Sequence, residues 1–245
     1  MIVQLGDGIR EMERLKSGVA RLVIADLPSG ETQAAFDKPV SLSYFWAAVH
    51  HALKADGTTV ILASSLRFAA QVVASNSAEF RYDLVWSKSA ATGFLNARKR
   101  PLRAHEFVLV FGRRGASIYN PQMVEGASPI HAARRRANSQ GENYNTTTRV
   151  TESRAGATDR FPTSVLEFGS VGTSSRARRH PQQKPIGLLQ WIIRTYSEPR
   201  SLVVDPCAGS GSTLEAAELE KRRAIGWDID PRFGISSASA SRRAS

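Results

Sequence analysis

A glycine-rich turn near the C-terminal end of the chain has the composition of a ligand-binding loop. It runs from Asp205 through Pro, Cys, Ala, Gly, Ser, Gly and Ser to Thr213, between a predicted strand and a predicted helix. Glycines let the backbone approach a ligand closely, and the N-terminus of the helix offers free N–H groups to an anion such as a carboxylate. No lysine follows the last glycine, which excludes a Walker-type phosphate loop. On its own, such a turn is often only a tight connection.

An acidic residue ends the next predicted strand and strengthens this interpretation. Asp228 follows Gly226 and Trp227. A carboxylate at that place can hydrogen-bond both ribose hydroxyls of a nucleoside cofactor. The turn and the carboxylate together favour nucleoside binding over a bare connection.

A second polar strand end lies in the N-terminal half, where Asp26, Leu27, Pro28 and Ser29 follow an apolar run. Asp and Pro are common in turns and helix caps, so this segment can be purely structural. In a parallel sheet, however, ligands bind beyond the carboxyl ends of the strands. The segment is therefore expected to lie near the glycine-rich turn.

These motifs, together with His180-Pro-Gln-Gln-Lys-Pro185, resemble the β-class amino-methylating DNA methyltransferases. Members of that family have a permuted chain, with the catalytic motif first, target recognition in the middle and the cofactor motif last. This chain has the same order, and the resemblance extends from about Asp7 to Asp230. It implies S-adenosyl-L-methionine as cofactor, double-stranded DNA as partner and methylation of an exocyclic amino group, with adenine N6 favoured because Asp26 begins the catalytic motif.

The resemblance also implies roles for individual residues. Asp26 and the Leu27 carbonyl would accept hydrogen bonds from the target amino group, Asp7 would contact the adenine ring of the cofactor, and Lys184 would pair with its carboxylate. Ser29 departs from the family pattern, which is Asp-Pro-Pro-Tyr or a phage-like Asp-Leu-Pro-Tyr whose aromatic ring stacks on the flipped base. The candidate catalytic residues are Asp26, Leu27, Pro28 and Ser29. The candidate cofactor-binding residues are Asp7, Lys184, Asp205, Cys207, Gly209, Ser210, Gly211, Ser212, Thr213 and Asp228.

The positive charge of the chain is concentrated in its middle. The net charge is +11, and the stretch 98–179 holds fifteen Lys or Arg against six Asp or Glu. A local excess of this kind is typical of a surface that contacts nucleic-acid phosphates. The candidate DNA-binding residues are Phe94, Asn96, Arg98, Arg134, Arg135 and Arg136. Surface solvation remains the alternative for each of them.

Other functions stay open from the residues alone. The related N4-cytosine enzymes resemble Ser-Pro-Pro-Tyr at the catalytic motif, an RNA substrate would fit the same chemistry, and loss of the aromatic residue at Ser29 would fit a nucleic-acid-binding protein on a decayed methyltransferase fold. A cytosine C5 methyltransferase, whose nucleophile is a Cys after Pro, is rejected. Cys207 follows a proline, but it lies within the predicted cofactor turn.

Alternating apolar runs and amphipathic segments predict an α/β fold with a doubly wound sheet. The resemblance implies that this fold is of the Rossmann-like methyltransferase type, with a mostly parallel sheet. Strands are expected at 3–5, 21–25, 58–63, 81–86, 105–111, 164–168, 201–204 and 223–227. Helices are expected at 9–15, 42–53, 66–73, 185–196 and 213–220. A turn is expected at Asp56-Gly57 and a polar loop at 87–104. The predicted parts are a catalytic half (1–112), an inserted target-recognition region (113–163), a cofactor-binding half (164–233) and a disordered tail (234–245).

The overall composition restricts the cellular setting. No apolar stretch reaches the roughly 18–20 residues of a membrane span, and the first ten residues lack the features of a signal peptide. A single cysteine excludes an internal disulfide and a cysteine-built zinc site, and the five histidines show no metal spacing. We therefore expect a cytoplasmic protein without a metal, of bacterial or phage origin and associated with the nucleoid. A homodimer is compatible with the resemblance, because many relatives dimerise.

Overall fold

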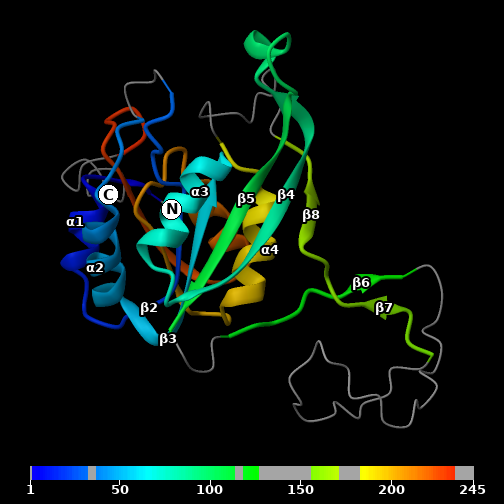
Figure 1. Cartoon of the computed structure of the whole chain (residues 1–245). Coiled ribbons are helices and arrows are strands. Elements are labelled where there is room, and N and C mark those ends of the chain that lie inside the picture. The colour runs from blue at the N-terminus through cyan, green and yellow to red at the C-terminus, as the bar shows by residue number, and fades with distance from the viewer. Residues whose placement is uncertain (1, 33–36, 114–117, 127–155, 171–182, 235–245) are drawn as a thin grey trace. The chain divides into compact units, whose positions relative to one another are not determined.

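The computed structural model describes residues 2–32, 37–113, 118–126, 156–170 and 183–234 (Figure 1). The chain forms two compact units. The first comprises Met1–Asn120 and Thr163–Ser245, and the second comprises Pro121–Pro162. The candidate site lies in the first unit.

Strands and helices alternate along most of the first unit. Its strands are β1 (Gln4–Leu5), β2 (Ala20–Ala25), β3 (Leu53–Ala63), β4 (Phe80–Thr92), β5 (Arg103–Gly112), β8 (Val165–Phe168), β9 (Leu202–Asp205) and β10 (Arg223–Asp228). Its helices are α1 (Gly8–Glu13), α2 (Leu42–Ala52), α3 (Leu66–Ser75), the 3-10 turn η1 (Phe94–Asn96), α4 (Ile186–Tyr196) and α5 (Ser212–Leu219).

The eight strands form one sheet in the order β1-β10-β9-β2-β3-β5-β4-β8. Neighbours from β1 to β3 are parallel, as are β4 and β8, whereas β5 is antiparallel to both β3 and β4. The permuted connectivity brings the N-terminal strand beside the C-terminal strand, with Gln4 opposite Trp227. The expected α/β, mostly parallel, Rossmann-like fold is confirmed.

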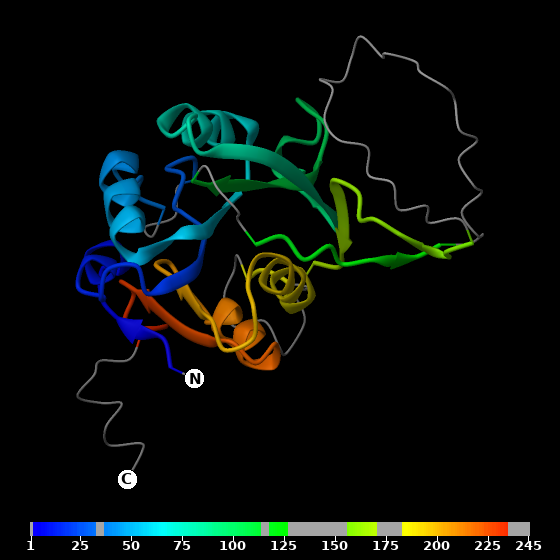
Figure 2. The same cartoon turned by 90° about the horizontal axis from the view of Figure 1, so that it is seen from below.

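Helices cover both faces of the sheet and create two apolar cores (Figure 2). One core contains buried side chains of α1, α2 and α3 such as Met12, Phe45 and Val72, and the other contains Leu188 and Ile192 of α4 with Ala216 of α5. Strand β2 lies between the cores. Its Val23 contributes to the first and its Leu22 to the second, which explains why this strand is a continuous apolar run.

Two expectations about loops are wrong. The segment 87–104 was expected to be a polar loop, but β4 continues to Thr92 and β5 begins at Arg103, because Ser87 pairs with His105 and Thr92 with Arg103. The Asp56-Gly57 turn is also absent, since both residues lie within β3. Gly57 packs closely against the Leu53 side chain, because a Cβ on Gly57 would lie 2.7 Å from Leu53 Cδ1.

The second unit is described at its two ends. Strands β6 (Val124–Glu125) and β7 (Asp159–Arg160) pair antiparallel, with Val124 opposite Arg160. Residues 127–155 between them lie outside the described residues, as does the expected disordered tail from residue 235 onward. The target-recognition role of region 113–163 stays a prediction.

Candidate active site

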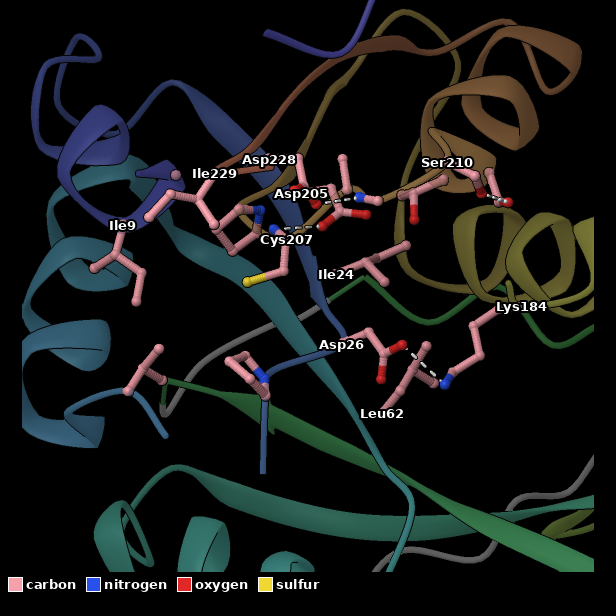
Figure 3. Close-up of a pocket in the computed structure, with 18 of the residues that line it drawn as sticks. Ile9, Ile24, Asp26, Leu62, Lys184, Asp205, Cys207, Ser210, Asp228 and Ile229 are labelled. Atoms are coloured by element: carbon pink, nitrogen blue, oxygen red, sulfur yellow. Dashed lines mark hydrogen bonds and ion pairs between the residues drawn. The ribbon is translucent and has the colours of Figure 1, made fainter. Parts of the chain in front are cut away.

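A hollow of about 430 Å³ lies at the carboxyl edge of the parallel strands (Figure 3). The first turn after β1, the end of β2, the glycine-rich turn after β9 and the end of β10 all contribute to its lining. Of the candidate residues, those that line it are Asp7, Asp26, Pro28, Lys184, Asp205, Cys207, Gly209, Ser210, Ser212, Thr213 and Asp228. The structure thus brings together residues that are up to 221 positions apart, from Asp7 to Asp228.

The glycine-rich turn is tied to the neighbouring strand end. The Gly209 N–H donates a 2.8 Å hydrogen bond to Asp228 Oδ2, and the Asp230 N–H donates one of the same length to Asp228 Oδ1. Gly211 is the N-cap of α5, with φ of +82°, and no side chain caps this helix. The first turn of α5 therefore keeps its N–H groups available for an anionic group of a ligand.

The loop after β1 lies directly against the glycine-rich turn. A Cβ on Gly8 would lie only 2.1 Å from the carbonyl oxygen of Pro206, so only glycine permits this backbone contact. Asp7 caps α1 by accepting hydrogen bonds from the backbone N–H groups of Ile9 and Arg10. The sequence alone left a turn as the alternative for Asp7. The structure shows this capping, and contact with a cofactor ring stays a prediction.

The carboxyl group of Asp205 keeps its proton to a higher pH than an ordinary aspartate does. Burial raises its pKa to about 7, and the nearby carboxylates of Asp26 and Asp228 act in the same direction. Hydrogen bonds from Thr213 and from the Cys207 N–H oppose the shift without cancelling it. Asp205 therefore serves mainly to hold the glycine-rich turn through its hydrogen bonds, rather than to add a negative charge to the hollow.

The raised pKa of Asp205 predicts a pH-dependent stability. Between pH 4 and pH 7 the folded protein keeps a proton on Asp205 that the unfolded chain, with a pKa near 3.8, has released. The stabilisation that this retained proton gives to the folded state is therefore fully present below pH 4, and it is lost as the pH rises through 7. In urea unfolding at several pH values, the unfolding free energy of the wild type should fall relative to that of Asp205→Asn over this window. Parallel curves for the two proteins would contradict the shift.

Asp26 lies in an ion-pair network at the end of β2. Lys184 Nζ is 2.8 Å from Asp26 Oδ2 and 3.2 Å from Glu106 Oε2, and Lys88 Nζ is 3.0 Å from Glu106 Oε1 (the Lys184–Asp26 pair is drawn in Figure 3). The resemblance implied a cofactor carboxylate as the partner of Lys184. In the structure its ammonium pairs with two protein carboxylates, and contact with the cofactor carboxylate stays a prediction. Glu106 escaped the sequence analysis, although a lone acid in the apolar run 105–111 was an available signal, and Lys88 was expected only as a residue of the polar loop 87–104.

A second hollow, of about 830 Å³, lies beyond the Asp26–Ser29 segment. Ser29 lines it, whereas Asp26 and Pro28 line the first hollow, and Leu27 between them is buried. Its other polar lining residues include Ser64, Ser65, Arg67, Gln71, Lys88, Thr92, Arg100, Arg103 and Glu106. The short segment from Asp26 to Ser29 therefore forms part of a wall between two hollows.

Asp37 fixes the loop that leads away from this wall. Its carboxylate accepts hydrogen bonds from the N–H groups of Gly30, at 2.8 Å, and Thr32, at 2.7 Å. Although burial alone would raise the pKa of Asp37, these bonds lower it below its usual range. Ser29 Oγ lies 3.5 Å from the same carboxylate. Serine at this position thus belongs to a polar loop arrangement.

The candidate DNA-binding residues are not all brought together. Phe94 and Asn96 lie in η1 at the tip of the β4–β5 hairpin, and the Phe94 side chain is 70% exposed. The preceding Gly93 lines the second hollow. Arg98 is exposed just after the tip. Arg134, Arg135 and Arg136 lie outside the described residues.

Residues 30–235 match the N6_N4_Mtase family, whose description is DNA methylase. This chain belongs to the N6/N4 DNA methylases. Two curated relatives are the methylase YubD of Escherichia coli (strain K12), 46% identical over 52 residues, and the DNA adenine methyltransferase YhdJ of the same organism, 36% identical over 75 residues. These alignments cover 21% and 30% of this chain but only 23% and 26% of the relatives' lengths.

Solved structures of DNA methyltransferases share the fold of this N6/N4 DNA methylase. The M1.HpyAVI–SAM complex superposes with a TM-score of 0.62 at 18% identity, covering 100% of this chain and 98% of the other. The cytosine-N4-specific PvuII DNA methyltransferase gives a TM-score of 0.65 at 17% identity, covering 98% and 88%. At these identities the likeness concerns the fold.

Cys207 has no nucleophilic character in this methylase. Burial raises the pKa of its thiol well above the usual range, and the surrounding carboxylates of Asp205 and Asp26 raise it further. A thiol must ionise to attack a base, so this environment opposes such a role. The geometry agrees with the rejection of a cytosine C5 mechanism.

The described residues include neither a metal-binding cluster nor a membrane-spanning helix. No group of three or more His, Cys, Asp or Glu side chains there could hold a metal ion. Within the same part of the chain, no helix has the length and apolar character needed to cross a membrane.

Proposed function

We propose that this methylase transfers a methyl group from S-adenosyl-L-methionine to the N6 amino group of adenine in double-stranded DNA. The observation that carries the proposal is the position of Asp26. Its carboxylate lines the hollow built by the glycine-rich turn and begins the wall that Ser29 continues into the second hollow. The first hollow suits the cofactor and the second suits an extruded base.

The first hollow fits the proposed cofactor. The uncapped N-terminus of α5 suits its carboxylate, and Asp228, at the end of β10, suits its ribose hydroxyls. Asp7, Gly8 and Ile9 line the same hollow, and we expect the adenine ring of the cofactor to bind beside Asp7. When bound, S-adenosyl-L-methionine supplies an electrophilic sulfonium methyl group.

The residues at the wall would prepare the amino group for attack. The lone pair of an adenine amino nitrogen is delocalised into the ring, so this nitrogen is a poor nucleophile. The Asp26 carboxylate and the Leu27 carbonyl would each accept a hydrogen bond from one N–H of the amino group. These bonds would localise the lone pair on the nitrogen. As the N–C bond forms, the bond between the methyl group and sulfur would break and leave a neutral thioether, and the nitrogen would release one proton, for which the Asp26 carboxylate is the adjacent acceptor. The base must first leave the duplex, at a cost of a few kcal/mol.

Contacts with DNA phosphates would help to offset that cost. Arg67 and Arg100 line the second hollow, and the chain carries a net charge of +11. We propose that Arg134 to Arg136 add further phosphate contacts and that the protein works in the cytoplasm, at the nucleoid. A homodimer remains compatible with this function.

Identification of the modified nucleoside tests the proposal. Purified protein is incubated with duplex DNA and cofactor, and the DNA is then digested and analysed by mass spectrometry. N6-methyladenine is the expected product. N4-methylcytosine would assign the enzyme to the other amino base, whereas the absence of any methylated nucleoside would favour a DNA-binding protein on a decayed fold. A parallel reaction with RNA tests the remaining substrate.

Asp228→Ala should weaken cofactor binding. Loss of hydrogen bonds that ribose hydroxyls donate to a charged carboxylate costs about 1.5–3 kcal/mol, or ~10- to 100-fold in affinity. Asp228 also accepts from the N–H groups of Gly209 and Asp230, so thermal unfolding of the variant measures the loss of loop support separately from the loss of cofactor contact. Calorimetric titration measures the affinity. Unchanged binding in Asp228→Ala would place the nucleoside site elsewhere.

Phe94→Ala should reduce methyl transfer if this ring takes the place of the missing aromatic residue at Ser29. Stacking on a base contributes about 1–3 kcal/mol, which corresponds to ~5- to 150-fold in rate. Phe94 is exposed and directly follows Gly93, which lines the second hollow, so its ring is available for stacking. Ser29→Tyr should then add little. Normal activity in Phe94→Ala, with raised activity in Ser29→Tyr, would contradict this assignment.

A further inference from the structure

Four alternating charges cross the wall between the two hollows. In order they are Lys88, Glu106, Lys184 and Asp26, joined by N–O distances of 3.0, 3.2 and 2.8 Å. Their side chains are only 6%, 13%, 11% and 29% exposed. Removing charges from water is costly, and apolar side chains fill such space at least as well. This arrangement therefore points to a functional role rather than to fold stability.

The sheet register explains how these residues meet. Ala25 pairs with Ile61 of β3, and Ala63 pairs with Phe107 of the antiparallel β5. Asp26 and Glu106, each next to one of these pairs, consequently lie at the same edge of the sheet. Lys184 reaches this edge from the segment that precedes α4. Asp26 and Lys184 line the first hollow, whereas Lys88 and Glu106 line the second.

We propose that Lys184 is a positioning residue for Asp26 and that Glu106 holds Lys184 in place. Lys184 thereby fixes the orientation of the Asp26 carboxylate toward the target amino group, instead of serving as the partner of the cofactor carboxylate. This inference rests on the proposed methyl transfer. It assigns a role to Glu106, which no sequence motif marks.

The partners of Lys184 support this assignment. An ammonium group has three N–H donors, and two carboxylates already lie within 3.2 Å of this one. Burial alone would lower the pKa of Lys184, but Asp26 and Glu106 more than compensate and raise it to about 12. The lysine therefore stays charged throughout the working range. A cofactor carboxylate would have to compete with both protein carboxylates for it.

Lys184→Met is the main test, with cofactor affinity and turnover measured separately. The kcat should fall by about 100-fold, the effect of a misplaced reacting group, while the Kd of S-adenosyl-L-methionine stays unchanged. Lys184→Arg keeps the charge and should recover part of the kcat. Lys54→Met is the matched control, because Lys54 is exposed in β3 and lines neither hollow. Its kcat should equal that of the wild type.

Glu106→Gln tests the second half of the proposal with a minimal change in shape. It should lower kcat less than Lys184→Met does, again without changing cofactor affinity. Glu218→Gln is its control, since Glu218 is exposed in α5 and lines neither hollow. Thermal unfolding of each variant shows whether it folds. If Lys184→Met does not fold, Lys184→Arg and Glu106→Gln still provide the kcat and Kd comparison.

The pH profile separates positioning from a purely structural role. The ionisable groups around Asp26 are Lys184 before α4, Glu106 in β5, Lys88 in β4, and Asp205 and Cys207 after β9. Without the lysine, the remaining carboxylates favour protonation of Asp26. The acid limb of the kcat profile should therefore move to higher pH in Lys184→Met and stay in place in Lys184→Arg.

Two results would overturn the inference. A higher Kd for the cofactor with an unchanged kcat in Lys184→Met would make Lys184 the partner of the cofactor carboxylate. Wild-type kcat and pH profile in both Lys184→Met and Glu106→Gln would make the network a spectator. Failure of the proposed function is distinct from either, because the wild-type protein would then transfer no methyl group to DNA or RNA.

Discussion

Asp26→Ala should abolish methyl transfer while leaving the cofactor affinity close to that of the wild type. The carboxylate is proposed to accept a hydrogen bond that strengthens as the amino nitrogen becomes tetrahedral. Loss of one such preorganised electrostatic contact costs about 100- to 1,000-fold in rate, and Asp26→Ala also removes the proposed proton acceptor, so transfer should fall below detection. The hollow keeps its glycine-rich turn and Asp228, which suit the cofactor, so binding should survive. Single-turnover transfer and calorimetric titration measure the two quantities.

A matched control makes this result specific. Asp83→Ala removes an exposed carboxylate from β4, outside both hollows, and should retain full activity. Retained turnover in Asp26→Ala would remove the mechanism proposed here. Loss of cofactor binding together with turnover would move Asp26 from the reacting group to the cofactor site.

Gly8→Ala should have the second-largest effect, on both stability and cofactor binding. The added Cβ would lie 2.1 Å from the Pro206 carbonyl oxygen and 2.6 Å from the Pro206 Cα, so the backbone of the loop or the turn must move. Overpacking of this kind costs about 1–3 kcal/mol of unfolding free energy. Both segments line the cofactor hollow, and its affinity for S-adenosyl-L-methionine should fall with the stability.

Gly6→Ala tests the same loop without the clash. The nearest atom to its added Cβ is Glu11 Cγ, at 3.4 Å, which is an ordinary contact with a flexible side chain. Thermal unfolding and calorimetric titration should therefore give near-wild-type values for Gly6→Ala and reduced values for Gly8→Ala. Equal behaviour of the two variants would contradict the close packing of this loop against the turn.

Much of the fold could be predicted because the central strands are buried on both faces. Strand β2 contributes to both apolar cores, so its sequence is an uninterrupted apolar run that reveals its place in a parallel sheet. The hairpin of β4 and β5 was harder to predict. Its outer part, from Ser87 to Thr92, does not alternate large apolar and polar residues, and the pairing is irregular between these positions. Side-chain pattern holds no information about such pairing.

The site was predictable where a motif coincides with a strand end. Asp26, Asp205 and Asp228 each end or follow a strand of the parallel sheet, so their convergence follows from topology. The roles of Glu106 and Asp37 were harder to predict, because neither belongs to a motif. Glu106 meets Lys184 across 78 positions of the chain, and Asp37 holds the N–H groups of a loop whose conformation no local pattern specifies.

Transfer of an isotopically labelled methyl group tests the central claim most directly. Wild-type protein and Asp26→Ala are incubated with duplex DNA and S-adenosyl-L-methionine that carries a deuterated methyl group, and the digested nucleosides are analysed by mass spectrometry. The account predicts N6-deuteromethyl-adenine with the wild type and no labelled nucleoside with Asp26→Ala. Label on carbon 5 of cytosine, or equal labelling by the two proteins, would contradict it.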